Sequence, residues 1–146
     1  MHDFLSANQS DLIERCKAKV ARRPGPRPTW DEQKFGIPSF LAQVIDMLRL
    51  DQQSNAFDVS REPASKKDLS EKVASTARRH AQELRKRGLS VDQVVHDYGD
   101  LCQAVTELAF ERNAGIAVGE FHTLNRLLDN AIAAAVTEYC SEAAKP

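Results

Sequence analysis

Apolar side chains recur at three- and four-residue spacing through most of the chain, which is the pattern of amphipathic helices. The clearest stretch covers residues 90–109. Ser90 and Gln93 at its start have the spacing of a capping box, and Leu89 and Val94 are placed to form a hydrophobic staple. The apolar positions of this predicted helix are Val91, Val94, Val95, Tyr98, Leu101, Cys102, Val105, Leu108 and Ala109.

A polar row runs along the opposite face of the same predicted helix. It consists of His96, Asp100, Gln103 and Glu107. Because successive residues of a helix are about 100° apart, these positions point away from the apolar stripe and we expect them to be exposed. A solvated face or a contact between two copies of the chain explains such a row. The row is therefore a candidate homodimer interface.

Four other segments carry a helical apolar stripe, and no segment predicts a strand. They are residues 10–23, 37–48, 66–87 and 118–143. Gly88 follows the third of them and is placed to act as a left-handed C-cap. Because the connection is so short, we expect the helices before and after Gly88 to form an antiparallel hairpin. The stripe of the last helix is Phe121, Leu124, Leu128, Ala131, Ile132, Ala135, Val136 and Tyr139.

Two segments interrupt the helical pattern. Residues 1–28 are predicted to form an N-terminal helix followed by a break, because three prolines lie at the end of this range. We expect Trp30 and Phe35 to pack the segment that follows against the bundle. Residues 51–65 are polar and predict a loop, and residues 66–143 then form a helical core with three long helices. We therefore predict one all-α domain over all 146 residues, either a four- to five-helix bundle or a globin-like packing.

Composition is that of an ordinary globular domain, with 42% hydrophobic and 28% charged residues. No run approaches the roughly 18 consecutive apolar residues that would span a membrane. The N-terminus lacks the basic region and apolar core of a signal peptide. These features predict a cytoplasmic protein with no membrane span.

Charge is unevenly distributed although the net charge is only −1. Residues 61–89 hold nine Lys and Arg against four Asp and Glu, whereas residues 90–146 hold three against nine. A nucleic-acid partner would be repelled by the acidic helix that follows the basic block. We therefore expect a solvated basic face and no nucleic-acid binding.

The three cysteines, Cys16, Cys102 and Cys140, are widely spaced and all fall on predicted apolar faces. We expect them to be buried, reduced thiols. A redox sensor would instead need an exposed thiol beside positive charge.

His80 lies within the apolar stripe of its predicted helix, where a phosphate-accepting histidine would be inaccessible. The residues that follow it faintly resemble the phosphoacceptor box of histidine kinases, but the spacing differs. We expect a core histidine with Tyr98 or Asn125 as its hydrogen-bond partner. The alternative is a ligand pocket formed by His80, Tyr98 and Asn125. A haem ligand is a third reading that we do not favour, so no cofactor is predicted.

His96 is the opposite case, because it is predicted to be exposed as in a histidine phosphotransfer domain. Its neighbours Asp92, Asp97 and Asp100 would repel an incoming phosphoryl group. His96 and Asp100 also have the i,i+4 spacing of a metal-binding pair, but no second cluster clearly completes a site. We predict neither a metal site nor a catalytic constellation, and hence no enzyme.

Residues 80–140 also carry a family resemblance, which thins over residues 1–75. The matching segments are LSVDQVVHDYGDLCQAVTELAFE and EFHTLNRLLDNAIAAAVTEY. They resemble the N-terminal domain of a group of bacterial sensor histidine kinases, related to the N-terminal domain of RsbR-type stress regulators (the RsbRD family). The resemblance implies a cytosolic helical input module without haem, and it fits a homodimer that regulates a downstream kinase or output domain.

The predicted function is therefore a non-catalytic signal-input domain that relays a ligand or partner signal through its C-terminal helix. Two alternatives stay open. One is a protein-interaction scaffold of the stressosome type. The other is a phosphotransfer protein that uses His96.

Overall fold

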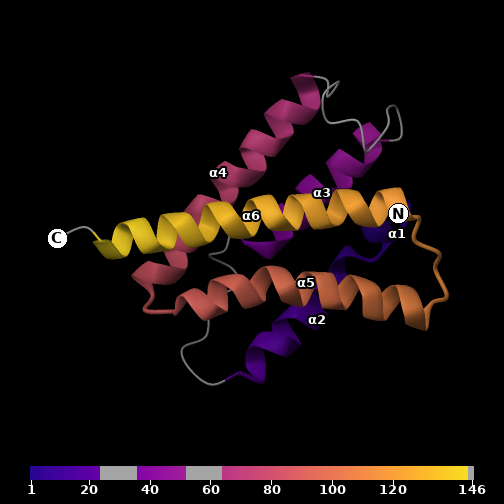
Figure 1. Ribbon diagram of the computed structural model, residues 1–146. Helices are drawn as coiled ribbons and strands as arrows, with labels where there is room; N and C mark the ends of the chain where they lie inside the picture. The colour runs from indigo at the N-terminus through magenta and orange to yellow at the C-terminus, as the bar shows by residue number, and fades with distance from the viewer. Residues whose placement is uncertain (24–35, 52–63, 145–146) are drawn as a thin grey trace.

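The computed structural model describes residues 1–23, 36–51 and 64–144. Over these residues the chain forms helices and no strand, which confirms the all-α prediction. Trp30, Phe35, the proline-rich break and nearly all of the predicted 51–65 loop lie outside the described residues. The six helices are α1 (His2–Ala7), α2 (Gln9–Ala21), α3 (Ile37–Asp51), α4 (Ala64–Lys86), α5 (Val91–Glu111) and α6 (Val118–Ala144) (Figure 1). No helix of the described residues combines the length and the apolar character needed to cross a bilayer.

The sequence pattern missed α1, because six residues are too few to show a period. Leu5 is fully buried and anchors this helix in the core. The helical path breaks at Asn8, whose φ of −121° is not helical. The side-chain amide of Asn8 donates to the carbonyl of Phe4 at 2.7 Å. This hydrogen bond satisfies a carbonyl at the end of α1, where the helical pattern of backbone hydrogen bonds stops. α1 and α2 are therefore two short helices joined at a single residue.

α5 and α6 run side by side in opposite directions, and α4 crosses behind α6 (Figure 1). α2 lies along the other side of α5. The backbones of α4 and α6 approach each other more extensively than those of any other pair of described helices. By contrast α4 and α5 touch over only a short length near their connecting turn. The predicted antiparallel hairpin of α4 and α5 is therefore wrong, because α4 packs along α6 and only briefly against α5.

Gly88 ends α4 in the left-handed conformation, as predicted, with φ of +76°. The N–H of Gly88 donates to Arg85 and the N–H of Leu89 donates to Leu84, both at 3.0 Å, in the pattern of a Schellman motif. No atom lies within 4 Å of where a Cβ at Gly88 would be, so the backbone angle alone favours glycine there.

The start of α5 is only partly as expected. Ser90 is the N-cap with extended backbone, and Leu89 and Val94 are both buried in the core. The predicted capping box is wrong, because the Ser90 hydroxyl makes no cap hydrogen bond with α5. Gln93 instead donates its side-chain amide to Asp97 at 2.7 Å.

α6 is the longest described helix, and half of its predicted stripe is buried: Leu124, Leu128, Ala131 and Ala135. Leu127 is also fully buried, although the sequence analysis did not include it. Phe121 is 36% exposed, so its predicted core position is wrong. α4 and α6 each carry two fully buried alanines four residues apart: Ala77 and Ala81 in α4, and Ala131 and Ala135 in α6.

Candidate functional site

Two carboxylates of α5 point into the protein. Asp97 is 2% exposed and Asp100 is 1% exposed. A buried carboxylate is costly unless it is paired or hydrogen-bonded. Asp97 is paired with His80 of α4, and Asp100 is paired with Arg23, which lies just after α2.

Asp97 joins α5 to α4 through His80. The Nε2 atom of His80 lies 2.8 Å from Oδ2 of Asp97, and Gln93 donates to the other carboxylate oxygen. His80 is 1% exposed, in agreement with its predicted core position. Its ring also meets the Tyr98 ring edge to face, with centroids 5.8 Å apart. His80 therefore holds α4 against α5, and it is inaccessible to a phosphoryl donor.

The predicted pocket of His80, Tyr98 and Asn125 does not assemble. Tyr98 contacts His80 through its ring, but Asn125 is exposed on α6. Asn125 falls beside the buried stripe of Leu124 and Leu128 rather than within it. The partner of His80 is Asp97, which the sequence suggested only as an acidic neighbour of His96.

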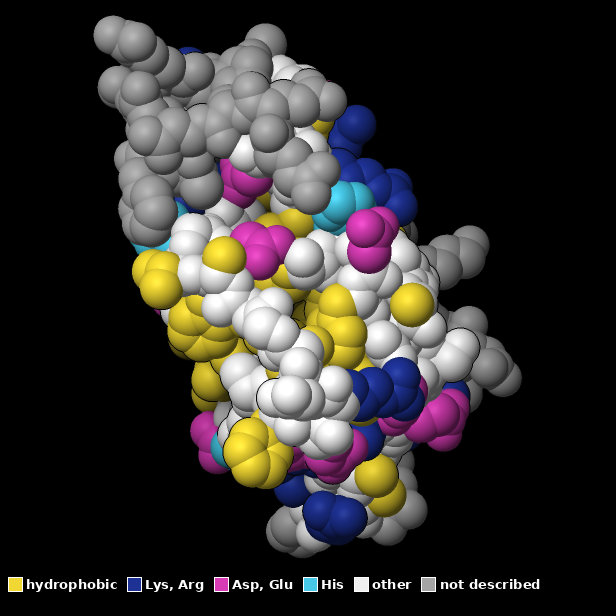
Figure 2. All heavy atoms as spheres, turned by 90° about the vertical axis from the view of Figure 1, so that its right-hand side faces the viewer, with side chains coloured by type: hydrophobic (Ala, Val, Ile, Leu, Met, Phe, Trp, Pro, Cys, Tyr) yellow, Lys and Arg dark blue, Asp and Glu magenta, His cyan; other side chains and the backbone are white. Residues whose placement is uncertain are grey.

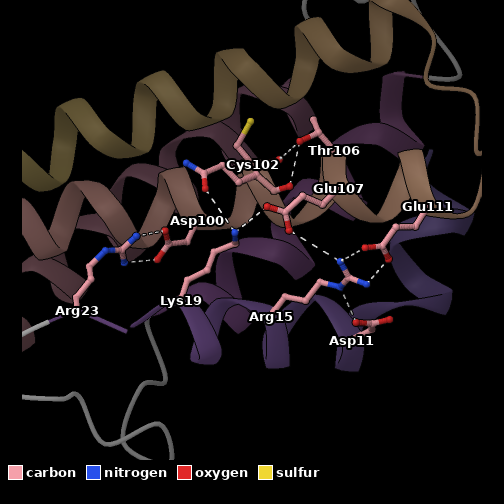
Figure 3. Close-up of polar contacts among 10 residues, drawn as sticks. Asp11, Arg15, Lys19, Arg23, Asp100, Cys102, Thr106, Glu107 and Glu111 are labelled. Atoms are coloured by element: carbon pink, nitrogen blue, oxygen red, sulfur yellow. Dashed lines mark hydrogen bonds and ion pairs between the residues drawn. The ribbon is translucent and has the colours of Figure 1, made fainter. Parts of the chain in front are cut away.

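Asp100 joins α5 to the end of α2. Both terminal nitrogens of the Arg23 guanidinium donate to the two carboxylate oxygens of Asp100, in a bidentate arrangement (Figure 3). The hydrogen bond to Asp100 raises the pKa of Arg23. The prediction that Asp100 lies on an exposed face is wrong, because Arg23 and the end of α2 cover it.

Further ion pairs follow Arg23 along α2, and we call the whole set the ion-pair ladder. Lys19 donates to Glu107 at 2.7 Å, and Arg15 donates to Glu111 at 2.5 Å (Figure 3). The ladder joins Asp11, Arg15, Lys19 and Arg23 of the first 23 residues to Asp100, Glu107, Glu111 and Arg112. Charges at four-residue spacing on and just beyond α2 therefore meet opposite charges on and just beyond α5.

The ladder changes how the polar row of α5 is understood. Gln103 and Glu107 are exposed by area, but both accept hydrogen bonds from Lys19, at 3.5 and 2.7 Å. The predicted dimer interface is thus largely occupied by α2 of the same chain. His96, Gln103 and Glu107 are exposed as predicted, whereas Asp100 is buried.

His96 lines an open pocket of about 330 Å³ at the start of α5. The other described lining residues are Arg23, Ser90, Asp92 and Gln93. The pocket is next to the buried Asp97, because Gln93 lines the pocket and also donates its side-chain amide to Asp97. Among the described residues, no group of three His, Cys, Asp or Glu side chains is arranged to hold a metal ion.

The cysteines differ in accessibility. Cys16 is buried, and burial together with the nearby charges of Asp100 and Asp97 raises its pKa to about 12. Cys102 is half-buried, and burial raises its pKa as well. Cys140 is exposed, so the prediction of three buried thiols is wrong for this residue.

Sequence reasoning missed Asp97 and the basic residues of α2. Asp97 follows Val94 by three residues and precedes Leu101 by four, so helical spacing places it on the buried face. Asp97 was nevertheless not included among the apolar-face positions. The four-residue spacing of Asp11, Arg15, Lys19 and Arg23 was equally visible in the sequence.

Comparison of the sequence and the structure with protein-family models, with curated proteins and with solved structures found no match.

Proposed function

We propose that this chain is a non-catalytic signal-input domain of a bacterial cytosolic sensor histidine kinase, which responds to a ligand or partner and relays the response through α6. The proposal rests on the resemblance of residues 80–140 and on the position of α6. The proposed partners are a second copy of the chain and a downstream kinase or output domain.

The observation that carries the proposal is the way α6 is joined to the other core helices. Its buried stripe packs against α3, α4 and α5. Near its C-terminal end the Tyr139 hydroxyl donates to the carbonyl of Leu89 at 2.7 Å, and Gln82 of α4 donates to Glu138 at 2.8 Å. A displacement of α4, or of the turn that follows it, would therefore move the last turns of α6.

The relay is tested with a chimera in which α6 continues after Ala144 into the dimerisation helix of a histidine kinase. Zero to seven residues are inserted at the junction, and autophosphorylation is measured. We expect activity to rise and fall with the helical period, since each residue turns the junction by about 100°. Activity that changes steadily with linker length would contradict a relay through α6.

A point variant within the domain sharpens this test. Leu127→Ala removes a fully buried side chain of α6, and we expect it to change kinase activity in the in-phase chimera. Asn130→Ala, on the exposed face of the same helix, is the matched control and should leave activity unchanged. Circular dichroism confirms that both variants remain folded. Equal activity in both would contradict the proposal.

An interaction scaffold is the second candidate, and one surface feature favours it. Phe110 is 87% exposed and Val118 is 80% exposed, on either side of the α5–α6 connection. Figure 2 shows apolar side chains at the surface of the face that carries this connection. If the chain is a scaffold, Phe110→Ser with Val118→Ser should abolish concentration-dependent assembly in analytical ultracentrifugation. An unchanged sedimentation profile would contradict it.

Phosphotransfer through His96 is the third candidate, favoured by the exposure of His96 beside an open pocket. It predicts acid-labile phosphate on the wild-type chain, and none on His96→Gln, after incubation with a cognate kinase.

A further inference from the structure

The first 23 residues, which we call the N-terminal strap, are held to the protein differently from the other helices. Among the described residues, the strap has four buried apolar side chains: Leu5, Leu12, Cys16 and Val20. α3 has seven in its 15 residues. In α2 the fully buried positions are four residues apart, and Ile13 packs beside them only partly buried, as do Met1 and Phe4 in the rest of the strap. A helix with so narrow a fully buried stripe is weakly anchored by the hydrophobic effect.

Charged groups provide much of the remaining attachment. The ion-pair ladder runs the length of α2, from Asp11 to Arg23 just after its end. At the other end of the strap the amino group of Met1 donates to Glu120 of α6 at 2.6 Å. Most of these pairs lie at the protein surface, where dissolved salt weakens the attraction between charges.

The remaining helices do not depend on these pairs. α4 and α6 pack through buried apolar residues, and His80 with Asp97 joins α4 to α5 without any residue of the strap. Segments with few buried apolar contacts and many exposed polar ones open locally at lower free energy than the core unfolds.

We propose that the N-terminal strap opens as one unit while α3, α4, α5 and α6 stay folded, and that the ion-pair ladder is the clasp that keeps it closed. Opening uncovers Asp100, Gln103 and Glu107 on α5, and it exposes the thiol of Cys16. Opening of the strap is a property of this chain alone, and it does not rest on the proposed function.

Cys16 provides a native reporter of opening, because alkylation requires its thiol to reach solvent. We would treat the protein with iodoacetamide at NaCl concentrations from 0.05 to 1 M and measure labelling of each cysteine by peptide mass spectrometry. Cys140 is exposed and serves as the internal control. We expect the labelling rate of Cys16 relative to Cys140 to rise about tenfold across this range as the clasp is screened.

Charge reversal tests the clasp directly. Lys19→Glu places a negative charge against Glu107, and we expect it to raise the relative labelling rate of Cys16 by about tenfold at low salt. The double variant Lys19→Glu with Glu107→Lys restores opposite charges and should return the rate towards that of the wild type. Lys72→Glu is the matched control, because Lys72 pairs with Asp68 within α4 at 3.5 Å and should leave Cys16 unaffected.

Hydrogen exchange distinguishes opening of the strap from unfolding of the whole chain. If the proposal holds, amides of α5 and α6 stay protected under conditions in which Cys16 is labelled rapidly. Labelling of Cys16 that rises only in step with exchange at Leu108 and Leu128 would overturn it. So would labelling that responds neither to salt nor to Lys19→Glu.

Discussion

Two helix contacts in this protein reach close packing by opposite chemical means. α2 rests on α5 through one narrow apolar stripe flanked by the ion-pair ladder (Figure 3). α4 and α6 share the most extensive backbone contact of the described helices, and both carry fully buried small side chains, Ala77 and Ala81 in α4 and Ala131 and Ala135 in α6. Small side chains let two helix axes approach closely. We therefore expect the first contact to depend on ionic strength and pH, and the second to depend on shape.

The largest expected effect is at the one ladder pair that includes a fully buried group. Arg23→Met removes the partner of Asp100, which is 1% exposed, and leaves a buried carboxylate unpaired. We expect a loss of about 3–5 kcal/mol in the free energy of unfolding, measured by urea denaturation. Adding Asp100→Asn should recover part of the loss. A loss below about 1 kcal/mol would show that water or another group already compensates Asp100.

A change of shape should disturb the α4–α6 contact. Ala131→Leu adds three carbon atoms where the side chain is fully buried, and we expect a loss of about 1–3 kcal/mol in unfolding free energy. The loss should be the same in 0.05 and 0.5 M NaCl. Ala133→Leu, on the exposed face of α6, is the control and should cost little. A salt-dependent loss at Ala131 would contradict the apolar description of this contact.

These two contacts also show what the sequence could and could not predict. Helical spacing located all the described helices except α1, since burying one face imposes the spacing on each helix separately. Which helices become partners is decided by surfaces that meet only in space. The short turn at Gly88 suggested that α4 pairs with α5, but α4 packs far more extensively against α6.

The candidate site was predictable to a smaller degree. The buried position of His80 followed from its place in an apolar stripe. Its partner did not, because Tyr98 or Asn125 was expected in place of Asp97. Asp100 was assigned to solvent because it lies opposite the apolar stripe, and nothing in the spacing of α5 reveals that Arg23, just after α2, covers it. Burial of a charge depends on a partner that is distant in sequence.

Acid should loosen the strap, because two carboxylates that pair with it, Glu111 and Glu120, titrate. The hydrogen bond from Arg15 lowers the pKa of Glu111. Burial raises the pKa of Glu120, but hydrogen bonds from the Met1 amino group and the Ala117 N–H outweigh it, so that pKa is lowered too. A lowered folded-state pKa stabilises the protein above the unfolded value of about 4.5, and this contribution is lost as the pH falls below it. We expect a smaller loss than for either variant above.

The measurement is the urea midpoint between pH 6 and pH 3. Glu120→Gln with Glu111→Gln should flatten the decline, because neither side chain then titrates. A decline of the same steepness in this double variant would show that other carboxylates are responsible.

The smallest expected effect comes from a single surface pair of the ladder. Lys19→Ala should cost about 0.2–1 kcal/mol at low salt and less at high salt, because ions screen the attraction to Glu107. Lys72→Ala, whose pair with Asp68 is exposed and local to α4, should cost less still. Equal losses in the two variants would show that the ladder adds nothing beyond an ordinary exposed pair.

Gly88 is a position at which L- and D-amino acids should have opposite effects on the free energy of unfolding. Its φ of +76° is unfavourable for L-residues and natural for their mirror images, and space around it is open. The loss of stability caused by L-alanine there would measure the cost of the backbone angle, because the added Cβ would not overlap with the surrounding residues. A D-alanine, introduced by joining synthetic peptides, would meet no such cost and would restrict the unfolded chain. The turn between α4 and α5 is thus a place where inverted chirality should stabilise a natural fold.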